Sequence, residues 1–210
     1  MTKTLTLIAA AASKNNGIGV NNGLPWRLPQ ELSYFTRVTK GAAADEKLPP
    51  AVPQMNACIM GRRSWEAIPP RFRPFAGRYN IVITSNPGLF GAEAPPYTIT
   101  QPSIRHALEH IDSVNAIGDM CINRIFIVGG GAIYAEALKA SDCHIQVLLT
   151  KVEFADADKC DVFFPELDTE AFPRQSHERL EQVAGITVPR GIQTEKGISY
   201  EFQLYEQAGP

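Results

Sequence analysis

The chain is predicted to fold as one α/β domain, residues 1–210, with a mostly parallel central β-sheet, an antiparallel C-terminal edge strand and flanking helices. Short apolar, β-branched runs alternate with helical patterns, which is typical of strands connected by helices. Several of these runs are continuously apolar, as in strands that are buried on both faces. The length of 210 residues suits one domain with a full hydrophobic core.

The elements follow from periodicity and from Gly and Pro signals. Strands are predicted at 4–12, 57–61, 79–85, 124–131, 144–154 and 195–207, the last with the alternation of an antiparallel edge strand. Helices are predicted at 31–40 (entered at Pro29), 62–68, 103–114 and 132–140. Loops rich in Pro, Ala, Gly or charge are predicted at 41–54, 88–96 and 114–121.

The composition excludes some classes of protein. A formal charge of −2 gives no basic footprint for a nucleic acid, and no apolar run of about 18 residues predicts a membrane span. The N-terminal MTKTLTLIAAAA has some features of a signal peptide, but a buried first strand explains it better. The four cysteines lack metal-site or CxxC spacing, so free thiols and a cytoplasmic location are expected.

The most informative segment is 17–35, GIGVNNGLPWRLPQELSYF. A flexible apolar loop and a turn at 22–26 lead into a helix that begins at Pro29. Helical spacing places Glu31 on one face with Phe35 and Val38, next to Leu32. A lone carboxylate on an apolar stripe is costly unless it is paired or used, so Glu31 is a candidate functional acid.

A second candidate is the glycine turn 128–134, VGGGAIY, which follows a strand and opens a helix. Helix N-termini bind phosphate through free N–H groups, and glycine allows a close backbone approach. The spacing is not that of the GxGxxG fingerprint. From these residues alone, a phosphate site and a plain tight turn are equally good explanations.

Four further residues carry possible chemistry, each with an ordinary structural alternative. Arg62 and Arg63 open a helix and suit a phosphate-bearing ligand, although a bare pair of arginines is more often a solvated surface. Arg78 precedes a strand and could bind a carboxylate through two hydrogen bonds, although a lone Arg is more often a surface residue. Thr150 lies in a strand, where Thr is commonly a strand former.

Eight short motifs, taken in their order along nearly the whole chain, resemble those of dihydrofolate reductase. They are IAA, GIGxNNGLPW, LPxEL, MGRRSW, PxxGRxNIVIT, IVGGGAIY, LTKVE and FFPE. The resemblance implies NADPH-dependent reduction of 7,8-dihydrofolate to 5,6,7,8-tetrahydrofolate, by hydride transfer to C6 and protonation of N5, in supply of one-carbon metabolism. The segments 41–54 and 113–123 resemble insertions of eukaryotic, particularly fungal, members.

The resemblance also implies a set of site residues. The catalytic set is Glu31, Trp26 and Thr150. The substrate set is Ala9, Ala10, Glu31, Leu32, Phe35, Ile68, Phe75, Arg78, Val128, Tyr134 and Thr150. The NADPH set is Ala11, Ile18, Gly19, Asn22, Gly23, Leu24, Gly61, Arg62, Arg63, Ser64, Thr84, Ser85, Gly129, Gly130, Gly131, Ala132, Ile133 and Tyr134.

Some roles are implied in more detail. Arg78 would hold the α-carboxylate of the folate tail, and Gly129 and Gly130 would be joined by a cis peptide. Gln101 and Pro102 stand where the family often has a further cation, a departure that slightly weakens the case for NADP. The segment 161–165, DVFFP, is expected to contribute packing with no catalytic role.

Two alternatives remain open at this point. A related reductase of the same fold, such as the riboflavin-pathway enzyme, lacks the Leu-Pro-Trp and acid at the helix start, so Glu31 discriminates. A non-catalytic NADP- or folate-binding protein would not need Glu31, Trp26 and Thr150 together. The expected partners are dihydrofolate and antifolate inhibitors, with no metal, nucleic acid or membrane, and the expected state is a monomer.

Overall fold

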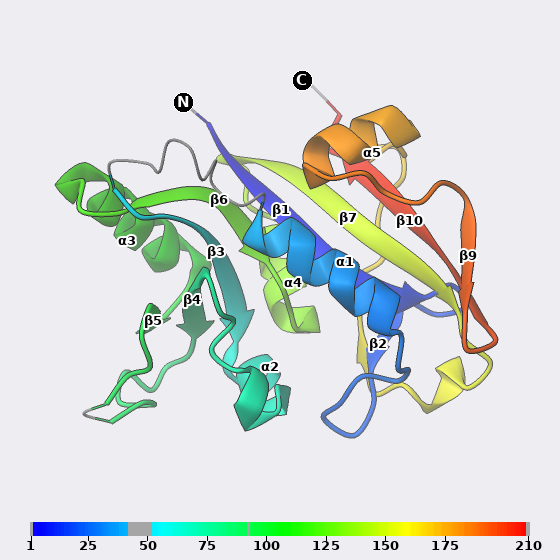
Figure 1. Cartoon of the computed structure of the whole chain (residues 1–210), viewed down its shortest axis with the longest axis horizontal. Coiled ribbons are helices and arrows are strands. Elements are labelled where there is room, and N and C mark those ends of the chain that lie inside the picture. Colours follow the sequence, from blue (N-terminus) through cyan, green and yellow to red (C-terminus); the bar gives the residue numbers. More distant parts are fainter. Residues whose placement is uncertain (1, 42–51, 92, 209–210) are drawn as a thin grey trace.

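The computed structural model describes residues 2–41, 52–91 and 93–208. Its centre is an eight-stranded sheet in the order β5-β4-β3-β6-β1-β7-β10-β9, with a separate two-stranded pair of β2 and β8 (Figure 1). The strands are β1 (Lys3–Ala12), β2 (Gly17–Gly19), β3 (Gln54–Gly61), β4 (Arg78–Ile83), β5 (Thr98–Gln101), β6 (Cys121–Ile127), β7 (Cys143–Glu153), β8 (Val162–Phe163), β9 (Ile192–Glu195) and β10 (Ile198–Glu206).

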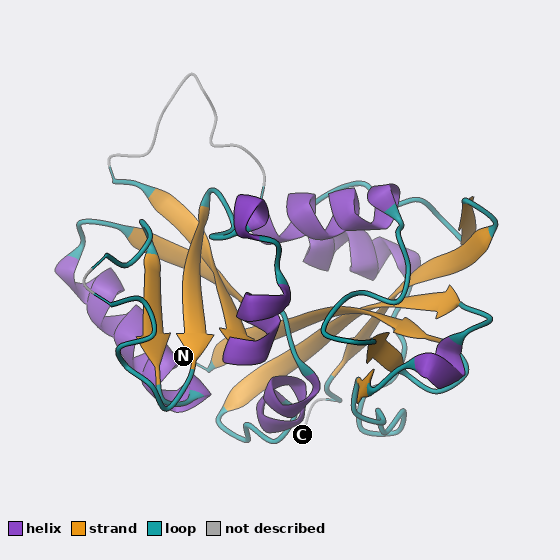
Figure 2. Cartoon of the chain, turned by 90° about the horizontal axis from the view of Figure 1, so that it is seen from below, coloured by secondary structure: helices purple, strands orange, loops and turns teal. Residues whose placement is uncertain are grey.

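The sheet is parallel from β5 to β7, and only β10 and β9 run antiparallel to their neighbours. This confirms the predicted mostly parallel sheet with an antiparallel C-terminal part. Figure 2 shows the strands changing direction across the sheet, which is the right-handed twist expected of extended L-residue strands. Parallel strands need long connections, and helices supply most of them.

Five α-helices and two short 3₁₀ turns complete the described chain: α1 (Pro29–Lys40), α2 (Arg62–Ala67), α3 (Ile104–Ile117), α4 (Gly131–Ala137), α5 (His177–Ala184), and turns at Pro70–Phe72 and Ala157–Lys159. One buried cluster unites α1, α2 and α5 with the sheet, and another unites α3 and α4 with it. The helices therefore cover both faces, with α1 and α5 in front of the central strands in Figure 1 and α4 behind.

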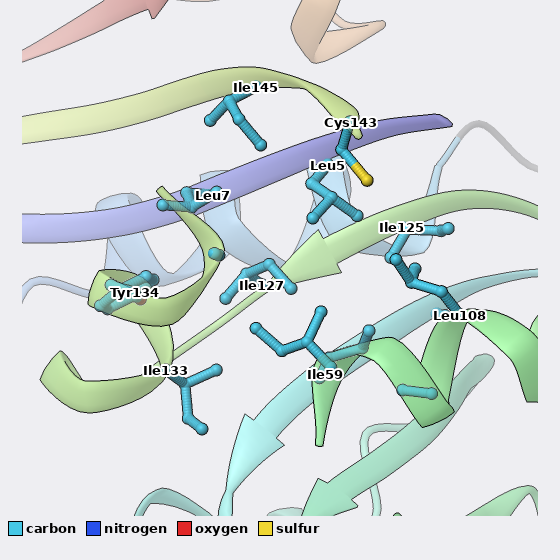
Figure 3. Close-up of a cluster of buried hydrophobic side chains, with 14 of the residues drawn as sticks. Leu5, Leu7, Ile59, Leu108, Ile125, Ile127, Ile133, Tyr134, Cys143 and Ile145 are labelled. Carbon is cyan, nitrogen blue, oxygen red and sulfur yellow. The ribbon is translucent and has the colours of Figure 1, made fainter. Parts of the chain in front are cut away.

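On the α3 and α4 side, the strands contribute apolar side chains to a buried core (Figure 3). Leu5 and Leu7 of β1, Ile59 of β3 and Ile127 of β6 are completely buried there. Burial of about 25 cal/mol per Å² of apolar surface makes such a layer the main stabilising contribution. It also fixes the strand ends from which the candidate site is built.

Several predicted boundaries were wrong. The helix expected at 103–114 continues to Ile117 and ends at Gly118, which has φ of 84°, and β6 begins at Cys121. The loop predicted at 114–121 is therefore helix up to Ile117 and strand from Cys121. The helix ends only at Gly118, and the side chain of Asn115 hydrogen-bonds the backbone N–H and carbonyl of Ile122 at 2.7 and 3.1 Å, which ties the end of α3 to β6.

The C-terminal segment 195–207 is not one strand. A turn at Lys196 and Gly197, with φ of 52° and 77°, separates β9 from β10. Two consecutive positive φ values are typical of a two-residue hairpin turn. The strand β10 pairs with β7 on one side and β9 on the other, so β9 forms the edge of the sheet.

Other differences are smaller. The elements β2, β5, β8, β9 and α5 were not predicted, because short or mixed segments carry little periodicity. The strand expected at 79–85 ends at Ile83, and the one expected at 124–131 ends at Ile127. Most of the predicted loop 41–54 lies outside the described residues.

All four cysteines are free, as predicted. Within residues 2–41, 52–91 and 93–208, no helix is both long and apolar enough to cross a membrane. The same part of the chain holds no cluster of three or more His, Cys, Asp or Glu side chains that could bind a metal ion.

Candidate active site

Glu31 enters the site from the first turn of α1. Proline at the first helical position has a suitable φ and lacks only an N–H that would have no helical partner, so Pro29 is a natural start. The hydroxyl of Thr150 donates a hydrogen bond to Oε1 of Glu31 at 3.1 Å. Thr150 is paired in the sheet with Ala10 of β1, so a rigid part of the sheet holds the hydroxyl.

The environment of Glu31 favours its neutral form. Burial raises the pKa of its carboxyl to about 7, with a smaller upward contribution from the negative charge of Glu195 and a downward one from the Thr150 hydrogen bond. Desolvation disfavours a charged carboxylate, which explains the direction. A carboxyl group that titrates near neutral pH can change its protonation during a reaction.

Aromatic side chains line the neighbourhood of α1. Phe35 meets Phe75 edge to face, with 5.6 Å between ring centroids, and Trp26 meets Phe154 in the same way at 5.5 Å. Trp26 is only 8% exposed, whereas Leu32, one residue after Glu31, is 51% exposed. An exposed leucine beside a half-buried acid leaves apolar surface available to a flat ring.

The predicted residues near α1 divide between the two faces of the sheet. Ala10, Phe35, Ile68, Phe75 and Val128 pack against the buried cluster beneath α1. Ala9, Ile18, Ala11, Ile133 and Tyr134 belong to or pack against the cluster beneath α4. Ala9, Ala10 and Ala11 lie near the carboxyl end of β1, and Val128 directly follows that of β6. Ligands bind at such strand ends in open parallel sheets.

The glycine turn lies directly after β6. The Gly129–Gly130 peptide is cis, as the resemblance implies, and the N–H of Gly61 donates to the carbonyl of Gly129 at 2.8 Å. A Cβ atom on Gly130 would lie 3.1 Å from Oγ of Ser64, and one on Gly131 would lie 2.5 Å from the carbonyl oxygen of Phe163. The turn is thus too crowded for a side chain at Gly131 and lies beside the start of α2.

Tyr134 connects this turn to the first strand. Its hydroxyl donates to the carbonyl oxygen of Ile8 at 2.7 Å, and its ring packs on Phe164 with centroids 4.9 Å apart. Burial raises the pKa of the phenol, and the nearby Glu31 raises it further. Tyr134 is therefore a neutral hydroxyl close to the acid.

The two arginines of α2 have different surroundings. Arg62 donates to both carboxylate oxygens of Glu66, at 2.8 and 3.1 Å. Arg63 is exposed, next to half-buried Ser64. Thr84 follows β4 and accepts a hydrogen bond from the N–H of Asn86, and Ser85 is exposed. Guanidinium and hydroxyl groups therefore follow the carboxyl end of β3, and hydroxyl groups follow that of β4.

Arg78 lies at the other end of β4 and is only 6% exposed. It donates to Oγ1 of Thr39 at 2.9 Å and to the carbonyl of Ala76 at 3.3 Å, and its guanidinium lies 4.6 Å from the ring centre of Phe75. Burial lowers the pKa of this guanidinium. Arg78 is therefore not the solvated surface residue that a lone arginine most often is.

The loop that contains Gly19, Asn22, Gly23 and Leu24 is tied to the segment after β7. Val20 and Gly23 exchange backbone hydrogen bonds of 3.0 and 2.9 Å around Asn21 and Asn22, which have φ of 48° and 59°. The carboxylate of Asp161 accepts a hydrogen bond from the N–H of Asn21 at 2.9 Å. Asp161, from which only packing was expected, thus anchors this loop.

Sequence reasoning missed three partners of the site: the carbonyl of Ile8, the carboxylate of Asp161, and Glu195, which accepts a hydrogen bond from the N–H of Gln30 at 3.0 Å. A backbone carbonyl carries no sequence signal. The two acids stand 140 and 165 residues from their partners, so only the folded chain brings them together.

A separate hollow of about 220 Å³ lies between the start of α5 and β10. Arg174, His177, Arg190 and Phe202 contribute to its walls. Both arginines are paired, with Glu201 and Glu178 respectively. The predicted site residues and this hollow have no residue in common.

The fold and the site define an α/β protein that presents a ligand site at the carboxyl ends of parallel strands. A family model described as dihydrofolate reductase matches residues 4–189. A dihydrofolate reductase of Heliothis virescens is 35% identical over 203 residues, which is 97% of each chain. One of Pneumocystis carinii is 35% identical over 209 residues, covering 97% of this chain and 96% of the relative.

A solved structure, Schistosoma mansoni dihydrofolate reductase, matches with a TM-score of 0.76 at 25% identity, over 99% of this chain and all of that one. The chain belongs to the dihydrofolate reductase family of oxidoreductases. Its relatives at this level of identity come from insects as well as from Pneumocystis carinii. Overall similarity therefore supports a eukaryotic type without singling out a fungal one.

Proposed function

We propose that this chain reduces 7,8-dihydrofolate to 5,6,7,8-tetrahydrofolate with NADPH. The single observation that carries the proposal is the half-buried carboxyl of Glu31, held by the Thr150 hydroxyl at 3.1 Å beside the open side of α1. Membership of the family supplies the reaction class, and this acid supplies the group that such a reaction needs in order to recognise a pterin.

The chain's own residues act on the substrate as follows. Ionised Glu31 accepts hydrogen bonds from the 2-amino group and N3–H of the pterin, and its charge favours the cation that forms when N5 is protonated. The proton reaches N5 through a water that Trp26 helps to hold, because Glu31 lies at the other edge of the ring. Leu32 and Phe35 pack against the ring faces.

The residues around the glycine turn suit NADPH. The turn opens α4, whose first N–H groups have no helical partners and can face a phosphate. Glycine is required at position 131 because a Cβ there would lie 2.5 Å from the carbonyl oxygen of Phe163, so the turn packs closely against β8. Arg62, Arg63, Ser64, Thr84 and Ser85 provide donors for the 2′-phosphate and the diphosphate. NADPH supplies the hydride when it is bound.

The test is an absorbance assay at the NADPH band with dihydrofolate as substrate. Oxidation that needs dihydrofolate and is lost in Glu31→Gln supports the proposal. Oxidation with a pyrimidine of the riboflavin pathway in place of dihydrofolate would favour the related reductase. Binding of NADPH and folate without turnover would favour a non-catalytic binding protein.

The proposal extends to the oligomeric state, the cellular location and the inhibitors of the protein. A monomer in the cytoplasm fits the four free thiols. Antifolates with a 4-amino group would donate to the backbone carbonyls of Ala9 and Val128. Sedimentation at micromolar concentration tests the monomer, and displacement of dihydrofolate by a diaminopyrimidine tests the inhibitor site.

A further inference from the structure

The N-terminus of α1 is capped by another part of the chain. Leu28 occupies the N-cap position and makes no side-chain capping hydrogen bond. Helices leave their first N–H groups without helical partners, and an Asp, Asn, Ser or Thr at the N-cap normally satisfies one of them. Here Oε2 of Glu195, from β9, accepts the hydrogen bond of the Gln30 N–H at 3.0 Å.

The capping carboxylate is adjacent to the candidate acid along the helix, because Gln30 immediately precedes Glu31. A negative charge at a helix N-terminus is also stabilised by the positive end of the helix dipole. Glu195 is half-buried at the end of β9, next to the two-residue turn of the hairpin. A short hairpin of this type holds its end residues in a defined position.

The same hairpin touches the site at a second place. Phe202 of β10 is paired in the sheet with Thr150 of β7, and its ring lies 4.2 Å, centroid to centroid, from Tyr34 of α1. The hairpin therefore contacts α1 both at its N-terminus and one turn later. The hairpin contacts α1, which carries Glu31, and pairs with β7, which carries Thr150. The same part of the sheet therefore positions both the carboxyl and the hydroxyl that holds it.

We propose that Glu195 is a positioning residue for Glu31: it fixes the first turn of α1 through the Gln30 N–H and places a second negative charge beside the Glu31 carboxyl. The proposal rests on the function proposed above for Glu31. It assigns to the C-terminal hairpin a direct effect on the ionisation and orientation of the acid.

The other groups that face Glu31 are uncharged at pH 7, so the charge effect on its carboxyl comes from Glu195. Tyr34 on α1, Tyr134 on α4 and Tyr200 on β10 have phenol pKa values raised, chiefly by burial, so they are neutral at pH 7. Thr150 on β7 contributes an uncharged hydrogen bond. Among the described residues, Glu195 is the charged neighbour that acts on the Glu31 pKa, in the upward direction.

Two variants separate the two roles of Glu195. Glu195→Gln keeps an acceptor oxygen for the Gln30 N–H and removes the charge, whereas Glu195→Ala removes both. Glu170→Gln is the matched control, because Glu170 is exposed and its near neighbour Phe172 packs in the cluster on the opposite face of the sheet from α1.

The first measurement is the titration of Glu31 by carbon-13 NMR of glutamate carboxyls in the free protein, assigned with Glu31→Gln. We expect the Glu31 midpoint to fall by roughly 0.5 pH unit in both Glu195 variants, because a like charge is removed. It should stay unchanged in Glu170→Gln. An unchanged midpoint in Glu195→Gln would overturn the charge effect.

The second measurement is kcat and KM for dihydrofolate together with the melting temperature. In Glu195→Ala we expect a several-fold higher KM and a melting temperature lower by about 2–4 °C, the usual result of losing one helix cap in a chain of this size. Glu195→Gln should keep both near wild type. A lower melting temperature with wild-type KM and titration would make Glu195 a helix cap only and overturn the proposal.

The two proposals fail in different ways. The Glu31 titration is measured on the free protein and does not depend on turnover. A wild-type protein that does not oxidise NADPH with dihydrofolate contradicts the proposed function alone. If Glu195→Ala does not fold, the Glu195→Gln titration still decides the inference.

Discussion

The Thr150 hydroxyl donates to the Glu31 carboxyl across 3.1 Å, although 119 residues separate them in the sequence. Thr150 belongs to a central strand and is only 1% exposed, so its position is set by the sheet and not by α1. The helix provides the acid, and the sheet provides the group that orients it. This hydrogen bond gives the half-buried carboxyl a fixed partner in the sheet.

Removing the charge of Glu31 tests its catalytic role. In Glu31→Gln we expect NADPH binding close to wild type and loss of most turnover at pH 7, because an amide cannot stabilise a cationic pterin. Turnover should recover partly at low pH, where the substrate is protonated before it binds. The measurement is kcat against pH with a cofactor titration in parallel, and full activity at pH 7 would contradict the role.

The raised pKa of Glu31 also predicts a dependence of stability on pH. The pKa rises from 4.5 to about 7 on folding, so the folded protein holds this proton more tightly than the unfolded chain does. The stabilisation from the protonated form is complete below about pH 4.5 and is lost as the pH rises through about 7.

In Glu31→Gln this loss of stability with rising pH is absent. The variant should gain stability relative to wild type as the pH rises from 4 to 8, by on the order of 1–3 kcal/mol after allowance for partial solvent contact. Melting temperatures of the two proteins across this pH range give the result. A difference that stays constant with pH would mean that the Glu31 pKa is not raised.

Arg62 and Arg63 are expected to set the choice between NADPH and NADH. Replacing both with Ala removes the charge that would face the 2′-phosphate, and hydrogen bonds to charged groups contribute about 1.5–3 kcal/mol each. The NADPH preference should fall by roughly 10- to 100-fold for each hydrogen bond to the 2′-phosphate that is removed. The measurement is KM for each cofactor.

The ion pair of Arg62 with Glu66 makes a finer prediction possible. Arg63→Ala should lower the preference for NADPH over NADH more than Arg62→Ala does, because Arg62 already has a carboxylate partner. Glu66→Gln frees the Arg62 guanidinium without removing it and serves as the control. Unchanged KM values for both cofactors in the double variant would assign the two arginines to a solvated surface.

Arg78→Leu is expected to separate folate from smaller inhibitors. The variant should bind dihydrofolate about 2–4 kcal/mol more weakly, since the tail carboxylate loses a charged partner, and should bind a lipophilic diaminopyrimidine nearly as before. Thr39→Val is the control, because it removes the hydroxyl that Arg78 contacts and leaves the guanidinium in place. Equal losses for both ligands would assign Arg78 to the fold.

Gly131→Ala tests the close packing of the glycine turn. A Cβ there would lie 2.5 Å from the carbonyl oxygen of Phe163, so backbone must shift, at a cost of about 1–3 kcal/mol. The melting temperature should fall by roughly 2–4 °C per kcal/mol. Gly88→Ala is the control, because its Cβ would meet nothing closer than 3.5 Å. A wild-type melting temperature for Gly131→Ala would show that the backbone of the turn can shift at little cost in stability.

The sequence predicted the parts of the fold that repeat a regular pattern over many residues. The strands β1, β3, β4, β6 and β7 and the helices α1 to α4 were all expected, with bounds that differ from the observed ones by up to four residues. It failed at β9 and β10, where the turn at Lys196 and Gly197 lies within one alternating run. It also failed at the end of α3, where the stop is set by Gly118 and by hydrogen bonds between the Asn115 side chain and Ile122 of β6.

The sequence by itself determined which chemical groups the site can contain: one acid on an apolar helix face, a glycine turn before a helix, and paired arginines after a strand. These follow from local spacing and side-chain type. Only the tertiary structure decided which groups meet. The contacts of Glu31 with Thr150, of Gln30 with Glu195 and of Tyr134 with Ile8 each span more than a hundred residues. Such contacts arise from strand order and burial, which no local pattern encodes.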